Sequence, residues 1–503
     1  VRVISLDSIP LTVSGDEGAQ GTEALKVLRG ELLNPFATSW LSVPTLSFFF
    51  NSLSIGLLGD TVFALRLPWA LVGTAAVVMM FLLTRQLKTL TLALMVGLVL
   101  ATYAYHIHFS RLGSNQIADT LLMASALFFL YRAYDHGRYL DWALAGVAAG
   151  LAQYFYAGAR LVTLIVLISV VVFVIREGWR FWYAQRAGII ILLGAFLITA
   201  APMLQYAVQY PRRYQGRVRQ VGILQNGWLD QAEQTNGQTA AEILLDQFRR
   251  TTLAYNATLD QSAWYGSTRP FLDGLPAVLF ILGLGYATLR PLDRRLFPLL
   301  LWWWGAILLG GVLTDNPPSS QRLIITAPVA IFFVALALWK SSQILQRLWP
   351  IPLVRSSVWV LGGILVAAIS IASLAQYFVD YTPQYRYGNP SAIRATELAR
   401  FARDNLDDRW QLVMVGAPYL YSNFGTLQYL LPTMPRSDLV EPLTKALDPA
   451  QYPPDQNLAF VFLEPRYGDF YFVRLAFPNG LLDTIAMPNN PEEVAFYVYR
   501  VVR

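Results

Sequence analysis

Asp16 and Glu17 are adjacent carboxylates near the start of a strongly apolar chain, in the stretch VSGDEGAQG. Neighbouring side chains diverge on both helices and strands, so the two carboxylates cannot point at one substrate. We therefore expect Asp16 to meet the substrate and Glu17 to have a supporting or helix-capping role. The other side chains that could take part are His106, His108, Arg111, Asp119, Tyr156, Arg160 and Arg322.

Acids and arginines without a thiol suit a reaction in which a phosphate group leaves. A leaving phosphate is a weak base, so it needs fixed positive charge and no general acid, and arginine offers a bidentate fork. An attacking hydroxyl does lose a proton, so one carboxylate must act as general base. Sugar transfer from a polyprenyl-phosphate donor to a hydroxyl fits these needs, and direct attack with one base implies inversion at the anomeric carbon.

The acids and arginines also have a purely structural interpretation. Asp16, Glu17 and Asp119 could cap the N-termini of helices. Arg322 follows the residues PPSSQ, and an arginine at a membrane interface often extends to lipid headgroups. Both interpretations stay open at this point.

His106 and His108 are spaced i, i+2, a spacing that suits metal binding on a strand better than on a helix. Interface packing or hydrogen bonding is therefore the favoured interpretation, and with Tyr156 these histidines are candidate substrate contacts. We expect no metal and no other cofactor; a divalent cation is the less favoured alternative.

The composition points to a membrane protein. The chain has 503 residues, of which 55% are hydrophobic and 14% charged, and its mean hydropathy is +0.42. A soluble protein carries about 25% charged residues. The net charge of +6 is then typical of basic cytoplasmic loops and not of nucleic-acid binding. The absence of cysteine excludes disulfides and thiolate sites.

Ten segments are apolar enough to be membrane spans of roughly 20 residues each. Residues 44–58 are apolar but short, so we expect an interfacial or re-entrant helix there. The sequence starts without an initiator Met or a signal peptide, and we expect that one N-terminal span is missing. The ten expected spans are residues 62–84, 89–105, 118–134, 141–157, 159–175, 188–206, 272–289, 295–313, 322–340 and 357–378.

The distribution of Lys and Arg sets the expected orientation. Under the ten-span count, five basic loops fall on one side, which the positive-inside rule makes cytoplasmic. The ionisable side chains named above fall on the other side, together with a long loop at 207–271. That loop holds the basic stretch YPRRYQGRVRQ, which could meet headgroups or the acceptor, or simply be solvated. The five basic loops are residues 85–88, 132–138, 176–186, 290–295 and 340–355.

Residues 379–503 form a second domain in our interpretation. SAIRATELARFARDN has the pattern of an amphipathic helix, and QLVMVG, LAFVFLE and EEVAFYVYRVV have that of strands. The expected fold class is a polytopic α-helical membrane protein, residues 1–378, with a small extracytoplasmic α/β domain. We expect the plasma or inner membrane of the cell as its location.

Four blocks of the sequence resemble the GT-C glycosyltransferases. The most similar group holds the protein O-mannosyltransferases and the lipid A aminoarabinose transferase, with bacterial members. The resemblance covers about residues 10–340, and the blocks occur in the expected order. They are GDEGAQGTEALKVLRGELLNPF, HIHFSRLGSNQIADTLL, AQYFYAGARL and PPSSQRLIITAP.

The resemblance implies a role for several residues. Asp16 would be the catalytic base with Glu17 beside it, and Asp119 a second acidic residue at the start of a span. Arg322, Arg160 and, less clearly, Arg111 would hold the lipid phosphate. The implied partners are a polyprenyl-phosphate sugar, the bilayer and a protein, lipid or glycan hydroxyl outside the cytoplasm; no nucleic acid is expected.

A membrane transporter with an extracytoplasmic domain is the alternative function. It would place essential charges near the bilayer centre and show an internal repeat. The sequence shows no such repeat, and its charges gather on one side under the span count. The glycosyltransferase is therefore the favoured prediction.

Overall fold

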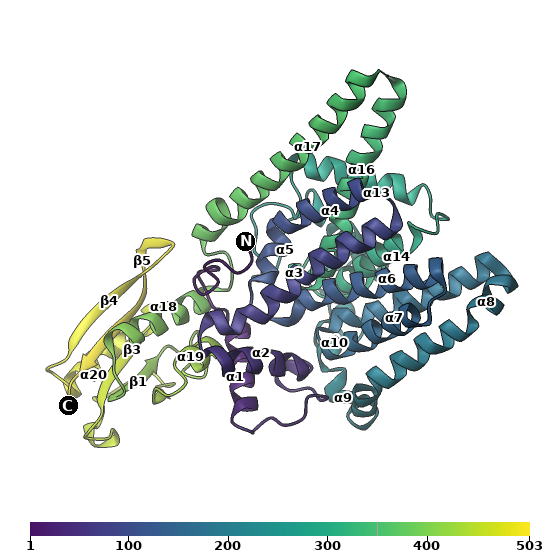
Figure 1. Cartoon of the computed structure of the whole chain (residues 1–503). Helices are drawn as coiled ribbons and strands as arrows, with labels where there is room; N and C mark the ends of the chain where they lie inside the picture. The colour runs from purple at the N-terminus through teal and green to yellow at the C-terminus, as the bar shows by residue number, and fades with distance from the viewer. Residues whose placement is uncertain (350) are drawn as a thin grey trace. The chain divides into compact units, whose positions relative to one another are not determined.

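The computed structural model describes residues 1–349 and 351–503, and Figure 1 shows the course of the chain. Pro350, which belongs to the expected basic loop 340–355, lies outside the described residues. Contacts group the chain into two compact units. The helical unit comprises Val1–Leu6, Leu33–Phe50 and Arg66–Tyr381; the C-terminal unit comprises Asp7–Leu32, Asn51–Leu65 and Thr382–Arg503.

The last segment of the C-terminal unit begins at Thr382, near the expected boundary between residues 378 and 379. The unit also includes two segments from the first 65 residues. The first of these contains helix α1, Gly15–Leu28, and with it the acidic pair. The next two helices, α2 (Leu46–Leu58) and α3 (Val62–Leu87), each have residues in both units.

Apolar helices make up most of the helical unit, and each of the ten expected spans overlaps at least one of them, two of the spans falling in α8. α16 is almost entirely buried because helices surround it, whereas α17 presents most of its apolar surface outward. After α3, the long elements are α4 (Leu90–Thr102), α5 (Ala104–Ser110), α6 (Ala118–His136), α7 (Tyr139–Leu151), α8 (Arg160–Gln209), α13 (Gly274–Thr288), α14 (Phe297–Ile307), α16 (Ala327–Leu348) and α17 (Pro352–Ala375).

Five helices among the described residues are long and apolar enough to cross a membrane, or six if the bent pair α4 and α5 forms one span. This test treats α8 as a single helix. Gly178 interrupts α8 with φ 71° and ψ −162°, a conformation that glycine adopts readily, so α8 is two helices joined in the expected loop 176–186. The ten-span count stays a prediction.

The long loop expected at 207–271 is largely helical. Its basic stretch forms two short helices, α9 (Pro211–Tyr214) and α10 (Gly216–Val221). α11 (Trp228–Asn236) and α12 (Ala240–Thr252) follow, and a capping box of Thr239 and Glu242 starts α12. A short helix, α15 (Ser320–Leu323), precedes α16.

The C-terminal unit contains a five-stranded mixed sheet in the order β2-β1-β3-β5-β4. The predicted helix and the three predicted strands are confirmed as α18, β1, β3 and β5. The elements are α18 (Pro390–Asn405), β1 (Trp410–Val415), α19 (Gly425–Leu430), β2 (Arg436–Asp438), β3 (Asn457–Phe462), α20 (Phe470–Ala476), β4 (Leu481–Met487) and β5 (Asn490–Val501).

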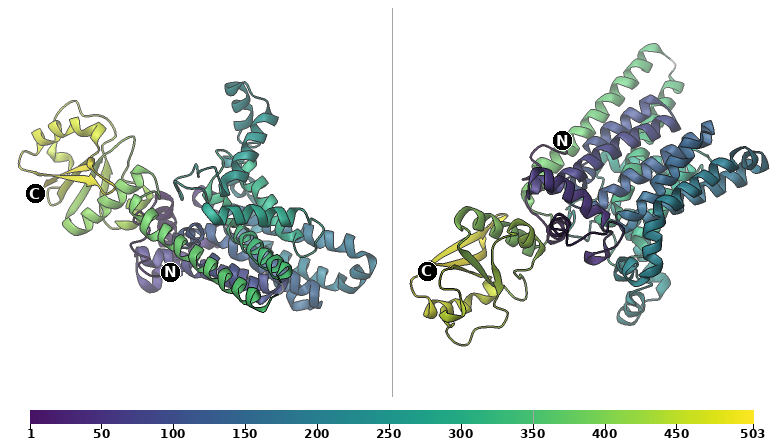
Figure 2. Two further views of the ribbon diagram at one scale, coloured as in Figure 1. Left: turned by 90° about the horizontal axis from the view of Figure 1, so that it is seen from above. Right: turned by 60° about the horizontal axis from the view of Figure 1, so that its bottom comes forward.

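The central strand β3 is buried along its whole length, as a strand covered on both faces should be. Ala459 and Val461 join a core with α18, α19 and Ala24 of α1, while Phe460 and Phe462 face a second core with α20. Helical segments lie on either side of the sheet in the left view of Figure 2. The predicted fold class, a polytopic helical protein with a small C-terminal α/β domain, is confirmed.

Candidate functional site

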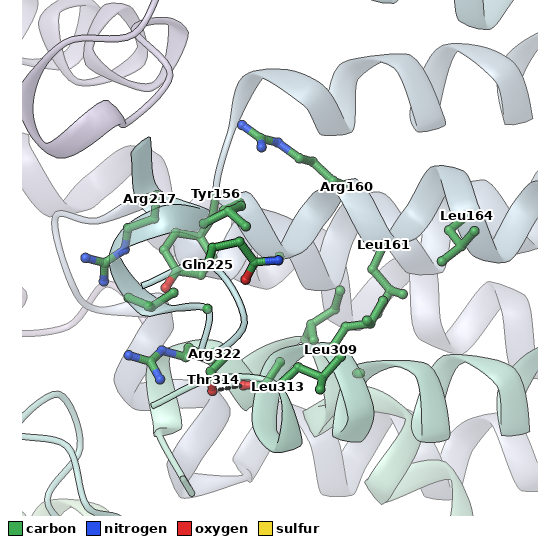
Figure 3. Close-up of a pocket in the computed structure, with 18 of the residues that line it drawn as sticks. Tyr156, Arg160, Leu161, Leu164, Arg217, Gln225, Leu309, Leu313, Thr314 and Arg322 are labelled. Atoms are coloured by element: carbon green, nitrogen blue, oxygen red, sulfur yellow. Dashed lines mark hydrogen bonds between the residues drawn. The ribbon is translucent and has the colours of Figure 1, made fainter. Parts of the chain in front are cut away.

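A cavity of about 380 Å³ lies in the helical unit, and three arginines from different elements line it. Arg160 begins α8, Arg217 lies on α10 and Arg322 lies on α15. In Figure 3 the guanidinium groups of Arg217 and Arg322 lie on one side, and Leu161, Leu164 and Leu309 lie on the other. The cavity is therefore basic at one end and apolar at the other.

Two nitrogens of Arg322 are held by hydrogen bonds to Asp315, and the third has no partner among the described residues. Its Nη1 donates to the carbonyl oxygen of Asp315 at 2.6 Å, and its Nη2 donates to the Asp315 carboxylate at 2.7 Å. Its buried Nε has no hydrogen-bond partner among the described residues. A buried donor without a partner is costly unless a ligand satisfies it.

Arg160 and Arg217 are held less firmly by the protein. Arg160 lies over the ring of Tyr214, 3.9 Å from its centroid, and donates to the Tyr214 carbonyl at 3.1 Å. Arg217 donates to Gln220 at 2.9 Å. Arg217 lies in the basic stretch YPRRYQGRVRQ, and the charge of this stretch alone did not distinguish Arg217 from its neighbouring arginines.

Main-chain hydrogen bonds join the end of α10 to the loop before α15, the helix that carries Arg322. The amide of Ile223 donates to Leu313, and the amide of Asp315 donates to Val221 at 2.9 Å. Gly222 and Thr314 form an isolated antiparallel bridge between these pairs. The pairing brings Arg217 and Arg322, which are far apart in sequence, to one cavity.

Asp260 holds the start of α15, the helix that carries Arg322. Its carboxylate accepts hydrogen bonds from the amides of Ser262, Gly266 and Ser320, each at 3.0 Å. Burial raises the pKa of Asp260, and these hydrogen bonds oppose the rise because they favour the charged form. With its oxygens engaged inside the protein, Asp260 is a structural anchor.

Asp119 lies beside the cavity wall. A Cβ atom added to Gly158, a lining residue, would come within 2.7 Å of the Asp119 Oδ2. The buried Oδ1 has no hydrogen-bond partner in the part of the chain that the structure describes. Asp119 is in the first turn of α6, whose N-cap is Ile117, so the helix dipole also favours a carboxylate there.

Asp16 and Glu17 belong to the C-terminal unit. The N-cap of α1 is Ser14, whose Oγ accepts the amide of Glu17 at 3.1 Å, so neither acid is the capping residue. Glu17 is buried and accepts a hydrogen bond from the Tyr387 hydroxyl at 3.2 Å, whereas Asp16 is half-buried. The two carboxylates point in different directions, as neighbours on a helix must.

Arg111 lies outside the set of described residues that line the cavity. The buried guanidinium of Arg111 donates to the carbonyls of Val1, Ile4 and Ser5 at 2.7 to 2.9 Å. These contacts fix the first residues of the chain. The predicted phosphate contact of Arg111 stays a prediction that these contacts do not support.

His106 and His108 are buried within the helical unit. His106 Nδ1 accepts from Arg2 at 3.0 Å, and His108 Nε2 lies 2.7 Å from the carbonyl of Trp264. The ring of His108 also packs against Tyr265. Tyr156, by contrast, lines the cavity. Among the described residues no group of three His, Cys, Asp or Glu is arranged to hold a metal.

A family model described as Dolichyl-phosphate-mannose-protein mannosyltransferase matches residues 42–206, which is less than half of the chain. Comparison with curated proteins found no match. The family match covers α2 to α8 and includes Asp119, Tyr156 and Arg160 of the candidate site.

Solved structures share the fold. ArnT from Cupriavidus metallidurans bound to undecaprenyl phosphate is similar with a TM-score of 0.61 and 13% identity, over 99% of this chain and 96% of that one. The apo state of that protein gives 0.58 at 13% identity, with the same coverage of both chains. Archaeal oligosaccharyltransferase AglB from Archaeoglobus fulgidus, in complex with an inhibitory peptide and a dolichol-phosphate, gives 0.50 at 15% identity, over 84% and 60%.

The predicted GT-C membrane fold is therefore confirmed, and the chain is a multi-pass membrane protein.

Proposed function

We propose that this chain is an inverting glycosyltransferase that moves a sugar from a polyprenyl-phosphate donor to a hydroxyl outside the cytoplasm. The observation that carries the proposal is a cavity lined by three arginines and several leucines, with Arg217 and Arg322 on one side and Leu161 and Leu164 on the other. That arrangement suits an anionic headgroup on an apolar chain. The shared fold of ArnT, solved bound to undecaprenyl phosphate, supports it.

The arginines stabilise the leaving phosphate in this proposal. As the bond between the anomeric carbon and the phosphate oxygen breaks, its electron pair stays with the phosphate, and guanidinium groups offset the added negative charge. Arg322 lines the cavity, its buried Nε has no hydrogen-bond partner in the described part of the chain, and Arg160 and Arg217 add positive charge to the same cavity. Leu161, Leu164 and Leu309 form the wall for the lipid.

The acceptor oxygen forms its bond to the anomeric carbon from the opposite face, which inverts the configuration. Its proton goes to a carboxylate, for which we propose Asp16, with Glu17 in support. Asp119 is the second acid, beside Gly158 of the cavity wall. Arg111, His106 and His108 stay outside the proposed machinery because the protein itself engages their side chains.

The proposal extends to location and partners. The active site and the C-terminal domain would face the extracytoplasmic side of the plasma or inner membrane, and the acceptor would be a protein, lipid or glycan hydroxyl. No cofactor is part of the proposal, because a leaving phosphate held by arginines needs none. The sugar, a hexose or a pentose, is left open.

The test is the affinity of the purified protein for undecaprenyl phosphate. Arg217→Ala and Arg322→Lys should each weaken binding, because a charge-assisted contact to a phosphate is lost; the expected loss is about tenfold or more. Lysine keeps the charge of Arg322 but not its planar fork. Arg219→Ala, on the same helix but outside the cavity lining, is the control and should bind as the wild type does.

A second test of the proposed function is mass spectrometry of envelope glycoconjugates from cells with and without the gene. A sugar that depends on the wild type and disappears with Arg322→Lys is the expected result. Unchanged lipid affinity in both arginine variants would refute the donor site, and unchanged glycoconjugates would refute the enzyme.

A further inference from the structure

The segment before α1 is bound to the C-terminal unit through its main chain. The amide of Val13 donates to Thr396 Oγ1 at 3.1 Å, and the carbonyl of Val13 accepts from Thr426 Oγ1 at 2.9 Å. Arg400 donates to the carbonyl of Leu11 at 2.6 Å. Because α18 and α19 supply all three side chains, the entry into α1 has a fixed position in this unit.

Small residues let α1 approach α19 closely. Gly15, Gly18 and Gly21 recur every third residue and so share one face of α1. A Cβ atom added to Gly18 would lie 2.4 Å from the carbonyl oxygen of Gly425, and one added to Gly21 would meet the ring of Tyr429. This contact fixes the rotation of α1 about its axis.

Tyr387 joins this arrangement to the acidic pair. Its buried hydroxyl lies 2.8 Å from Ser14 Oγ, the N-cap of α1, and donates to Glu17 Oε2 at 3.2 Å. Successive residues of a helix are about 100° apart around its axis. Holding Glu17 toward Tyr387 therefore also sets the direction of Asp16.

We propose that the C-terminal unit serves to position the acidic helix, and that Tyr387 is a positioning residue for Asp16 and Glu17. This inference rests on the proposed function, in which Asp16 receives the acceptor proton. It gives the C-terminal unit a part in the proton transfer of the proposed reaction.

Tyr387→Phe tests the inference because it removes one hydroxyl and little volume. The buried carboxylate of Glu17 loses a donor, so kcat should fall by about tenfold, in line with the loss of one hydrogen bond to a charged group. The affinity for undecaprenyl phosphate should not change. Thr426→Val removes the hydroxyl that holds Val13 and should act in the same direction. Tyr471→Phe, at an exposed tyrosine of the same unit, is the control.

Three readouts separate positioning from general damage. The rate of sugar transfer from an undecaprenyl-phosphate sugar to envelope acceptors gives kcat and KM, and binding of undecaprenyl phosphate alone reports the donor site. Hydrogen exchange of residues 15–20 reports the order of α1 and should become faster in both variants. The positioning role predicts a lower kcat, faster exchange in α1 and unchanged lipid affinity.

Two results would overturn the inference. Wild-type kcat in both variants would remove the positioning role while leaving the proposed function intact. Equal losses of kcat and lipid affinity would show a general structural defect instead. Failure of the proposed function looks different, because the wild type itself would then transfer no sugar from the undecaprenyl-phosphate donor. Failure of the proposed base alone would leave Asp16→Asn with wild-type kcat, whatever Tyr387→Phe does.

Discussion

Arg322 is fixed by the protein and also lines the cavity. Two of its nitrogens bind Asp315, which orients the guanidinium, and the third has no partner among the described residues. Arg111 is the opposite case, since it donates to the carbonyls of Val1, Ile4 and Ser5. The residue type alone does not distinguish the two, because the sequence does not show which carbonyls lie nearby.

Asp16→Asn tests the proposed role of Asp16 as the general base. Asparagine keeps the shape but cannot take a proton, so transfer should fall by about a hundredfold or more, as for loss of a general base. Undecaprenyl phosphate should bind as before, because the cavity arginines are unchanged. Asp7→Asn, at an exposed position of the same unit, is the control for a nearby loss of charge.

Asp119→Asn discriminates between the two acids in the same assay. If Asp119 supports the site without taking the proton, its variant should lose less activity than Asp16→Asn. The reverse order would transfer the role of base to Asp119, and equal wild-type rates in both variants would contradict both assignments.

Some residues of the candidate site could be predicted from the sequence. Tyr156 and Arg160 were chosen from one block and Arg322 from another, and all three line one cavity. Arg217 was missed, because in the sequence it is one of several arginines in a basic stretch. His106 and His108 are buried, and hydrogen bonds and a ring contact within the protein engage their side chains. Packing and hydrogen bonding were the interpretation favoured from their spacing.

Among the elements, helix positions were the most predictable feature. Long apolar runs gave helices at each expected span, since a buried or lipid-facing helix needs little else. Helices α9 to α12 in the 207–271 loop were not predicted, because their pattern is weaker and short helices depend on packing. The place of α1 in the C-terminal unit could not be read from sequence either, as contacts over hundreds of residues decide it.

Two glycines of α13 give a matched test of helix packing. A Cβ at Gly283 would lie 1.9 Å from the carbonyl oxygen of Phe333 on α16, whereas one at Gly285 would meet no described residue within 4 Å. Gly283→Ala should therefore destabilise the protein by about 1–3 kcal/mol. Gly285→Ala should be neutral or stabilise by up to about 1 kcal/mol through helix propensity.

Thermal unfolding of both variants in detergent measures this difference. The packing of α13 on α16 predicts a lower midpoint for Gly283→Ala alone. Equal midpoints for the two variants would contradict the close approach of these helices.

For the whole molecule, the orientation in the membrane can be tested with single cysteines because the chain has none of its own. Gly468 is an exposed residue of the C-terminal unit, and Leu292 is exposed in the expected cytoplasmic loop 290–295. A membrane-impermeant maleimide applied to intact cells or spheroplasts should label Gly468→Cys and spare Leu292→Cys until the membrane is opened. Labelling of Leu292→Cys from outside, with Gly468→Cys protected, would invert the topology.

The central claim is that the arginine cavity holds the phosphate of a polyprenyl-phosphate donor. The most direct measurement is a cryo-EM structure of the protein with undecaprenyl phosphate. Phosphate density should lie within about 3 Å of the guanidinium nitrogens of Arg217 and Arg322, with the lipid along Leu161 and Leu309. Phosphate density elsewhere, for example in the second cavity between Tyr103 and Gln376, would contradict it.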